Sequence, residues 1–404
     1  MDARTGLPVV GMVGAGQLAR MTQQAAIALG QSLHVLAESG DDGAALVTAD
    51  VMIGDYRSLA DLRAFAAGCD VVTFDHEHVP NEHIAALAAD GVAVYPGADA
   101  LRYAQDKAVM RRRLSDLEIP VPEWIDLGVD DQATTLTAFG DRVGWPLVLK
   151  AARGGYDGKG VWVVDSLAQA LAVAESAAAA GTALIAEEKV AIVRELAADL
   201  ARSPFGQGAA WPVVETVQAD GICVEVIAPA PDLSEELADE AQQIALTLAR
   251  ELGVVGVLAV EMFELAASDA RPTGAFSGRL LVNELAMRPH NSAHWTIEGA
   301  RTSQFEQHLR AVLDYPLGTT SVTAPVTVMA NLLAGPDDVV PKGIDERVHH
   351  CLAAWPDVKI HLYGKGFRPG RKVGHVTALG HDLATVRDRA RAAADYLANG
   401  DGHG

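Results

Sequence analysis

Residues 280–295 read LLVNELAMRPHNSAHW, a short apolar run followed at once by a dense group of polar side chains. The leading aliphatic residues predict a buried strand, and Asn283 and Glu284 follow where that strand should leave the core. Upstream, residues 256–263 (GVLAVEMF) predict a second apolar strand with one acid, Glu261. If the two strands pair, Glu261, Asn283 and Glu284 converge as oxygen ligands that Mg²⁺ accepts, with nucleotide phosphates completing its coordination.

The plainer alternative is that Glu261 and Glu284 are charges at strand edges that pair with surface lysines. Each acid taken alone fits that alternative equally well. Two apolar strands that each carry a single acid favour the metal site, because an unpaired carboxylate is costly to bury.

Length and charge limit the classes of protein to which the chain can belong. Its 404 residues suffice for about two or three hydrophobic cores. The formal net charge of −21 argues against non-specific binding to nucleic acid or to an anionic membrane. No apolar run approaches the ~18 residues of a membrane-spanning helix, and residues 1–8 do not resemble a signal peptide. We therefore expect a cytoplasmic protein whose phosphate sites are built from local cations.

An N-terminal βαβ pattern carries a glycine-rich turn. Residues 9–13 predict a strand, GAG at residues 14–16 a turn, and residues 32–37 a second strand that ends in Glu38. This spacing matches the dinucleotide-binding fingerprint, with alanine at its third position. By itself the pattern is compatible with a dehydrogenase or with a tight turn that binds nothing, because it shows only that backbone N–H groups can face an anion.

Two further strands end in ionisable side chains. Residues 71–74 lead into DHEH at residues 75–78, the position where open α/β sheets bind ligands. We expect Glu77 to contact a substrate, and we do not expect zinc because no other ligand spacing lies nearby. Residues 183–188 (ALIAEE) also end in acids, which suit the amino group of adenine and the hydroxyl groups of ribose.

The segment between these regions predicts a helix and a boundary. Residues 103–117 predict one amphipathic helix in which Arg111, Arg112 and Arg113 form a solvated face. The prolines of IPVP at residues 119–122 mark a domain boundary.

Two flexible or basic segments are candidates for binding phosphate. Residues 151–160 (AARGGYDGKG) contain four glycines between two predicted strands, so their backbone can approach phosphates closely. Lys150 precedes this loop on a strand and is the expected fixed phosphate contact. Residues 359–372 contain five lysine or arginine residues and no acid. The alternatives are that residues 151–160 form only an exposed turn and that the charges of residues 359–372 only make the surface soluble.

Taken in order, these motifs resemble the ATP-grasp superfamily and, within it, the 5-(carboxyamino)imidazole ribonucleotide synthetase family. The resemblance covers nearly the whole chain. It is most specific in NELAMRPHNSAHW (283–295), SQFEQHLRAV (303–312) and YGKGFRPGRKVGHV (363–376).

The resemblance implies a three-domain ATP-grasp fold of the α/β and α+β classes. Its parts would be a Rossmann-like parallel-sheet domain at residues 1–120, a small lid at 121–208 and a mixed-sheet catalytic domain at 209–404. The family is commonly dimeric, so a homodimer is expected, without nucleic-acid or membrane partners.

The resemblance also assigns roles to residues, motif by motif. ATP would be bound by Lys107, Lys150, Gly155, Tyr156, Asp157, Gly158, Lys159, Gly160, Val161, Glu187, Glu188, Lys189, Val190, Glu195, Glu215, Asn283 and Glu284. The ribonucleotide would be bound by Gln17, Leu18, Glu77, Tyr156, Arg288, His290, Lys365 and Arg371. Glu261 and Glu284 would hold Mg²⁺, for which Mn²⁺ could substitute. Asp157, His290 and Lys365 would be catalytic.

The implied reaction uses ATP and bicarbonate to form carboxyphosphate, which delivers CO₂ to the exocyclic amine of 5-aminoimidazole ribonucleotide in purine biosynthesis. Asp157 or His290 would take the amine proton. The sequence departs from the family at Met287, Ala293 and Ala197, which replace a usual proline, glycine and serine. These departures affect the expected backbone path more than the chemistry.

Three other functions compete with this assignment. Another ATP-grasp ligase, such as a formate-dependent glycinamide ribonucleotide transformylase or a biotin carboxylase-like enzyme, would share the lysines, the loop and the acid pair. Assignment as a dehydrogenase would depend on the N-terminal glycine turn and Glu38 alone. A catalytically silent nucleotide-binding regulator would not need both acids, both lysines and the basic loop.

Overall fold

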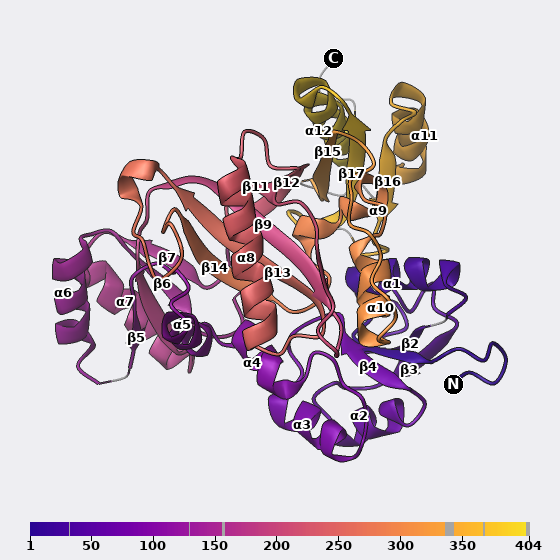
Figure 1. Cartoon of the computed structure of the whole chain (residues 1–404), viewed down its shortest axis with the longest axis horizontal. Coiled ribbons are helices and arrows are strands. Elements are labelled where there is room, and N and C mark those ends of the chain that lie inside the picture. Colours follow the sequence, from indigo (N-terminus) through magenta and orange to yellow (C-terminus); the bar gives the residue numbers. More distant parts are fainter. Residues whose placement is uncertain (32, 129, 156–157, 336–342, 367, 401–404) are drawn as a thin grey trace.

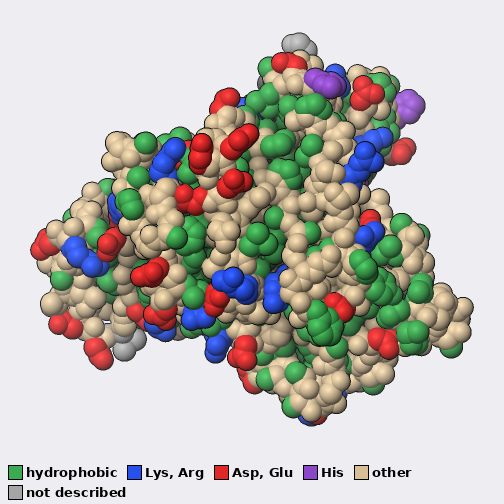
Figure 2. All heavy atoms as spheres, in the orientation of Figure 1, with side chains coloured by type: hydrophobic (Ala, Val, Ile, Leu, Met, Phe, Trp, Pro, Cys, Tyr) green, Lys and Arg blue, Asp and Glu red, His purple; other side chains and the backbone are tan. Residues whose placement is uncertain are grey.

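The structure is a computed structural model that describes residues 1–31, 33–128, 130–155, 158–335, 343–366 and 368–400. Within these residues the strands form three sheets, each accompanied by helices (Figure 1). In the same ranges, none of the helices combines the length and the apolar composition needed to span a bilayer. On the face drawn in Figure 2, acidic side chains are scattered over the surface and basic ones lie between them.

The N-terminal sheet is parallel. Its strands are β1 (Val10–Val13), β2 (Leu33–Ala37), β3 (Asp50–Ile53) and β4 (Val71–Phe74), and its helices are α1 (Gln17–Ala28), α2 (Leu59–Ala66), α3 (Asn81–Ala89) and α4 (Ala98–Gln105). The strand order is β3-β2-β1-β4. The expected βαβ unit is therefore confirmed. Beyond β4, residues near Pro96 contribute only a bridge between Val72 and Val94, because proline cannot extend the ladder.

The second sheet, which we call the lid sheet, is antiparallel. It contains β5 (Trp124–Leu127), β6 (Leu147–Ala151), β7 (Val161–Val164) and β8 (Leu184–Glu188), with α6 (Gln132–Val143) and α7 (Leu167–Ala179). The strand order is β5-β8-β6-β7. Leu147 and Leu149 of β6 join the core beneath the two helices. Since side chains alternate along a strand, Lys150 lies on the opposite face of the lid sheet.

The third and largest sheet has nine strands. They are β9 (Ile192–Arg202), β10 (Gly208–Ala210), β11 (Val214–Ala219), β12 (Ile222–Ala228), β13 (Gly256–Leu265), β14 (Leu280–Ala286), β15 (Val326–Leu333), β16 (Lys359–Leu362) and β17 (Lys372–Gly380). The order is β14-β13-β9-β11-β12-β15-β17-β16, and β10 pairs with β9. The resemblance implied a mixed sheet, but all the pairings between these strands are antiparallel.

Helices cover the large sheet on both faces. They are α8 (Glu235–Glu251), α9 (Thr296–Gly299), α10 (Gln304–Val312), α11 (Ile344–Ala354) and α12 (Leu383–Asn399), with short 3-10 turns η1 (Ala267–Asp269) and η2 (Asn291–Ala293). Leu196, Ala198 and Leu200 of β9 pack in one core with α8. The alternating residues, such as Glu195 and Asp199, lie on the other face, which we call the site face.

Strand pairing bears on the division between lid and catalytic domain. β9 precedes residue 208, yet it pairs with β13 inside the large sheet, and β10, which begins at Gly208, pairs with β9. These pairings attach β9 and β10 to the large sheet and not to the lid sheet.

The helix expected at residues 103–117 is broken at Asp106. α4 ends at Gln105, and α5 (Lys107–Asp116) begins with the Asp106 side chain accepting a hydrogen bond from the Val109 N–H. This N-cap is the physical reason for the break, because an aspartate that accepts from the first turn starts a new helix.

Candidate functional site

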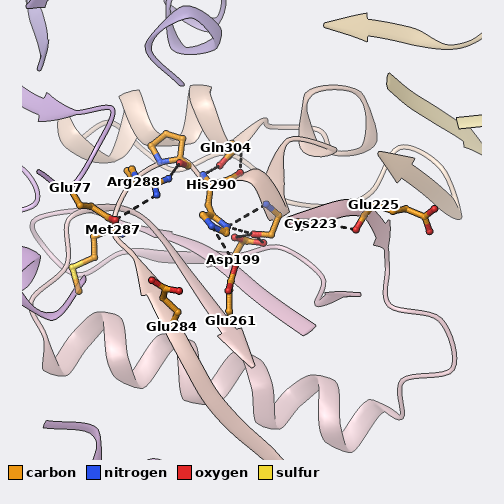
Figure 3. Close-up of polar contacts among 12 residues, drawn as sticks. Glu77, Asp199, Cys223, Glu225, Glu261, Glu284, Met287, Arg288, His290 and Gln304 are labelled. Atoms are coloured by element: carbon orange, nitrogen blue, oxygen red, sulfur yellow. Dashed lines mark hydrogen bonds and ion pairs between the residues drawn. The ribbon is translucent and has the colours of Figure 1, made fainter. Parts of the chain in front are cut away.

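The two acids that opened the sequence analysis lie opposite each other on paired strands. β13 and β14 run antiparallel, and Glu261 is in register with Glu284. Figure 3 shows the two carboxylates side by side on the site face. The expected pairing of these strands is confirmed.

An irregularity in this pairing brings Asn283 to the same side as Glu284. The register shifts beside Glu261, so one residue of β14 is left over. Val282 and Leu285 both join the core under α8, which leaves Asn283 and Glu284 between two inward-facing residues. In a regular strand these neighbours would point to opposite faces, and a bulge removes that constraint.

The electrostatics of the acid pair fit a divalent cation. Burial and the neighbouring Glu284 carboxylate raise the pKa of Glu261 to about 8. Among the described residues, no group of three or more histidine, cysteine, aspartate or glutamate side chains is arranged to hold a metal. Two carboxylates with a carboxamide beside them suit Mg²⁺, which takes one or two protein carboxylates and completes its shell with phosphates and water.

Two lysines approach this strand from other elements. Lys107 Nζ donates to Glu284 Oε1 at 2.9 Å, and Lys150 Nζ donates to Asn283 Oδ1 at 2.9 Å. Lys107 starts α5, whereas Lys150 lies on the lid sheet. The structure therefore brings both expected phosphate contacts to Asn283 and Glu284 of β14 from sequence positions far apart.

Glu187, expected at the nucleotide, is a buried carboxylate paired with two cations. It lies 2.7 Å from Lys150 Nζ and accepts from Arg111 Nε at 2.7 Å. Burial acts to raise the pKa of Glu187, but the charges of Arg111 and Lys150 outweigh it and lower the pKa to about 2. Burial also lowers the pKa of Lys150, and Glu187 opposes that effect. Glu187 is thus the counterion of both Lys150 and Arg111.

Glu188 is likewise occupied. Its Oε1 accepts from the Glu123 N–H at 2.8 Å and is paired with Arg271. These two contacts tie the end of β8 to the residue before β5 and to the segment between β13 and β14.

An apolar cluster lies where the end of the lid sheet meets the large sheet. Val190 packs with Phe263, Leu265 and Leu281, and Lys150 Nζ lies 5.9 Å from the centre of the Phe263 ring. A flat aromatic base can bind to such a surface while its phosphates reach the lysine.

Glu195 borders this cluster on β9. It is in register with Phe263, burial raises the pKa of its carboxyl, and the Gln218 side chain makes a hydrogen bond to it. Gln218 is a residue that the sequence analysis missed. The strand register reveals it, because Thr216 is in register with Glu195 and Gln218 follows two residues later on the same face of β11.

Glu215 does not join this group. It is in register with Leu196, which faces α8, and it lies 3.2 Å from Arg194. Its side chain therefore lies on the face of the large sheet opposite Glu195 and Glu261, because neighbours along a strand point to opposite faces.

The glycine-rich loop reaches toward the hairpin between β11 and β12. A side chain on Gly158 would meet the Gly221 Cα at 3.2 Å, and one on Gly155 would meet the Lys159 carbonyl oxygen at 2.8 Å. Gly160 has a positive φ, and its carbonyl accepts from the Ala151 N–H. Glycine is thus needed for the loop to pass this close to other backbone. Two further members of the expected site, Tyr156 and Asp157, lie outside the described residues.

His290 approaches the acid pair from the segment after β14. Its Nε2 lies 3.5 Å from Glu261 Oε1, and its Nδ1 lies 2.8 Å from the Ser292 hydroxyl (Figure 3). Burial, with the charges of Arg288 and Lys372, lowers the pKa of His290 to about 3. Ser292 donates in turn to Asp199 at 2.9 Å, and burial raises the pKa of Asp199 to about 7.

Gln304 clamps the backbone of His290. Its Oε1 accepts from the His290 N–H at 2.7 Å, and its Nε2 donates to the His290 carbonyl at 2.8 Å and to His294 Nδ1 at 2.8 Å. His294 Nε2 lies 3.4 Å from the amide nitrogen of Gln17, and Lys365 donates to Gln17 Oε1 at 2.6 Å. This polar network joins His290 to Gln17 and Lys365, three residues expected at one substrate.

We expect Gln304→Leu to destabilise the fold by about 2 kcal/mol or more, because each buried polar group left without a partner costs about 1–3 kcal/mol. The change leaves both backbone groups of His290 unpaired. Urea unfolding measures the effect, with Gln243→Leu on the exposed side of α8 as the matched control. An unchanged midpoint for Gln304→Leu would contradict the clamp.

The N-terminal domain contributes Glu77 but does not offer its glycine turn to an anion. Glu77 Oε1 accepts from the Met287 N–H at 2.8 Å, and its Oε2 lies 3.6 Å from Arg288 (Figure 3). The Gly16 N–H donates instead to Asp75 Oδ2 at 2.5 Å. Because that carboxylate already occupies the start of α1, the dinucleotide interpretation is wrong.

The remaining residues expected at a ligand differ in their exposure. Leu18 is buried with Met21 and Phe305, so only its backbone can face a ligand. Glu38, the acid of the dinucleotide pattern, pairs with Arg57 on the surface. Arg371 donates to the Gly366 carbonyl at 3.1 Å and is exposed on the basic loop.

Models of protein families match three parts of the chain. Residues 7–105 match a ribonucleotide synthetase preATP-grasp domain, residues 112–305 an ATP-grasp domain, and residues 327–389 a phosphoribosylaminoimidazole carboxylase C-terminal domain.

Curated and solved proteins extend this similarity to the full length. The N5-carboxyaminoimidazole ribonucleotide synthase of Mycobacterium tuberculosis is 58% identical over 393 residues, which are 97% of this chain and 88% of that protein. The enzyme of Aspergillus clavatus complexed with ATP is 31% identical, with a TM-score of 0.85, over 96% of this chain and 98% of that one. Its complex with ADP and 5-aminoimidazole ribonucleotide has a TM-score of 0.84, with the same identity and coverage.

Proposed function

Because the chain belongs to the N5-carboxyaminoimidazole ribonucleotide synthase family of ATP-grasp enzymes, we propose that it carboxylates the exocyclic amine of 5-aminoimidazole ribonucleotide with ATP and bicarbonate. It is an ATP-dependent carbon–nitrogen ligase of purine biosynthesis. The products are 5-(carboxyamino)imidazole ribonucleotide, ADP and phosphate.

The observation that carries this proposal is the position of the acid pair between two groups of side chains. Lys107 and Lys150 contact Glu284 and Asn283 on one side. His290 lies 3.5 Å from Glu261 on the other. A phosphoryl donor and an amine acceptor can therefore bind on either side of one cation site.

The lysine side suits the first stage of the reaction. A bicarbonate oxygen attacks the γ-phosphorus of ATP, the bond to ADP breaks, and carboxyphosphate forms. Phosphoryl transfer requires mainly positioning and neutralisation of charge. Lys107 and Lys150 would supply two ammonium groups to the phosphates. Mg²⁺ held by Glu261 and Glu284, or Mn²⁺ in its place, would add the positive charge that those carboxylates are arranged to receive.

The histidine side suits the second stage. Carboxyphosphate releases CO₂ and phosphate, the amine nitrogen bonds to the CO₂ carbon, and the nitrogen loses a proton. Burial lowers the pKa of His290 to about 3, so its imidazole is neutral near pH 7 and has a lone pair for that proton. His290 is held in place by Gln304 and Ser292. Glu77, Arg288, Lys365 and Arg371 would hold the ribonucleotide.

A coupled assay of ADP release tests the function. We expect ADP release to depend on both bicarbonate and 5-aminoimidazole ribonucleotide. Stimulation by formate with glycinamide ribonucleotide, or by biotin, would instead indicate another ATP-grasp ligase. Tight NADH binding without ATP binding would reject the whole class.

Arg371→Ala is expected to raise the Michaelis constant for 5-aminoimidazole ribonucleotide by about 10- to 100-fold, the equivalent of one hydrogen bond to a charged group. The turnover number and the constant for ATP should change little, because Arg371 would hold the acceptor only. Steady-state kinetics measure both, and Arg389→Ala on α12, which pairs with Asp357, is the control. An unchanged constant would mean that the basic loop is only surface.

The domain division and the assembly are part of the same proposal. The strand pairing supports domains that end near residue 120 and between β8 and β9. A homodimer in the cytoplasm follows from the family resemblance, and light scattering of the purified protein tests the dimer.

A further inference from the structure

Arg111 is a buried cation that the two-stage reaction does not yet use. It lies on α5, four residues after Lys107, so the two side chains project from the same face of the helix. Arg111 is 0% exposed. Its neighbours Arg112 and Arg113 reach the surface, where they pair with Asp126 and Glu251. The expected solvated face therefore holds for two of the three arginines only.

The contacts of Arg111 join the lid sheet to the strand of the metal-binding acids. Its Nε donates to Glu187 Oε1 at 2.7 Å on β8, and its NH1 donates to the Val282 carbonyl at 3.1 Å on β14. Glu187 lies 2.7 Å from Lys150 through its other oxygen, and Lys150 donates to Asn283. The four side chains and β14 thus form a closed circuit.

The circuit restrains a side chain that is otherwise mobile. A lysine carries one ammonium group on a flexible stem, whereas the arginine guanidinium is rigid and fixes a carboxylate in a defined orientation. Arg111 holds one oxygen of Glu187, so the second oxygen has a fixed direction toward Lys150. The contact with Val282 anchors Arg111 itself to the residue next to Asn283.

We propose that Arg111 is a positioning residue that, through Glu187, holds the Lys150 ammonium group aimed at the phosphates of the nucleotide. This inference rests on the proposed function, because it requires Lys150 to bind phosphate. A purely structural ion pair would have the same contacts, so the test must separate binding of the phosphates from binding of the base.

Arg111→Met is expected to weaken binding of ADP about 10- to 100-fold, the usual cost of removing a residue that orients a ligand-binding group. Binding of adenosine, which has no phosphate, should not change. Calorimetry measures ADP and ligand-observed NMR measures adenosine. Arg111→Lys keeps a charge for Glu187 and should recover part of the loss, and Arg112→Met on the same helix is the matched control.

A second comparison tests whether Arg111 acts through Lys150. In a Lys150→Met background, adding Arg111→Met should weaken ADP binding no further, since residues that act as a unit are not additive. If Arg111→Met does not fold, the same comparison is made with Glu187→Gln. Additive losses, or an equal loss for adenosine, would overturn the inference. Wild-type protein that fails to bind ADP would overturn the proposed function instead.

Discussion

Glu284→Gln is expected to lower the turnover number about 100-fold or more, as the loss of transition-state charge stabilisation does. Glutamine keeps the size of the side chain and its contact with Lys107 but removes one of the two carboxylates that face each other across β13 and β14. The Mg²⁺ concentration needed for half-maximal rate should rise as well. Steady-state kinetics over a range of Mg²⁺ concentrations measure both effects.

The control for this prediction is Glu306→Gln. Glu306 pairs with Arg310 along α10 and lies outside the acid pair, so its replacement should leave turnover unchanged. Glu261→Gln should resemble Glu284→Gln, because the two acids would share one cation in the proposed site. Near-normal turnover of Glu284→Gln would remove Glu284 from the metal site.

Lys150→Met is expected to lower kcat/KM for ATP by about 100- to 1,000-fold, the range found when one preorganised donor to developing charge is removed. Methionine has a similar length and no charge. Glu187 keeps Arg111 as a partner, so the lid sheet should remain folded, and near-normal thermal stability checks this.

Lys150→Met should change the kinetic constants for ATP only. The Michaelis constant for 5-aminoimidazole ribonucleotide should stay near the wild-type value, because Lys150 lies with Asn283 and not with His290. Arg63→Met, which removes a surface cation of α2 that pairs with Asp90, is the control. An equal loss for both substrates would indicate that Lys150 supports the fold and does not bind phosphate.

Much of the fold follows from local pattern. Short apolar runs such as residues 256–263 and 280–282 predict strands, because a strand that is buried on both faces has apolar residues at successive positions. Both strands are present. The βαβ order of the N-terminal region likewise predicts a parallel sheet. The motif resemblance then supplies the domain arrangement, which periodicity alone does not.

The candidate site was predicted less completely, for a reason that Glu215 and Gln218 make clear. Both lie on β11 and both are polar, but only the register with β9 shows that Gln218 faces Glu195 while Glu215 faces α8. Asp75 is a similar case. Its carboxylate fills the glycine turn that resembles an anion site, a contact across 59 residues that no local pattern shows.

The sequence by itself determined which segments become strands and helices and which acids, lysines and histidines are available for chemistry, because periodicity and motif spacing are local properties of the chain. Only the tertiary structure decided which of these side chains meet. The bulge in β14 places the side chain of Asn283 on the same side of the strand as that of Glu284. Arg111 is fully buried where it contacts Glu187, 76 residues away. Such contacts depend on strand register and on the compensation of buried charge, which arise only when distant segments pack together.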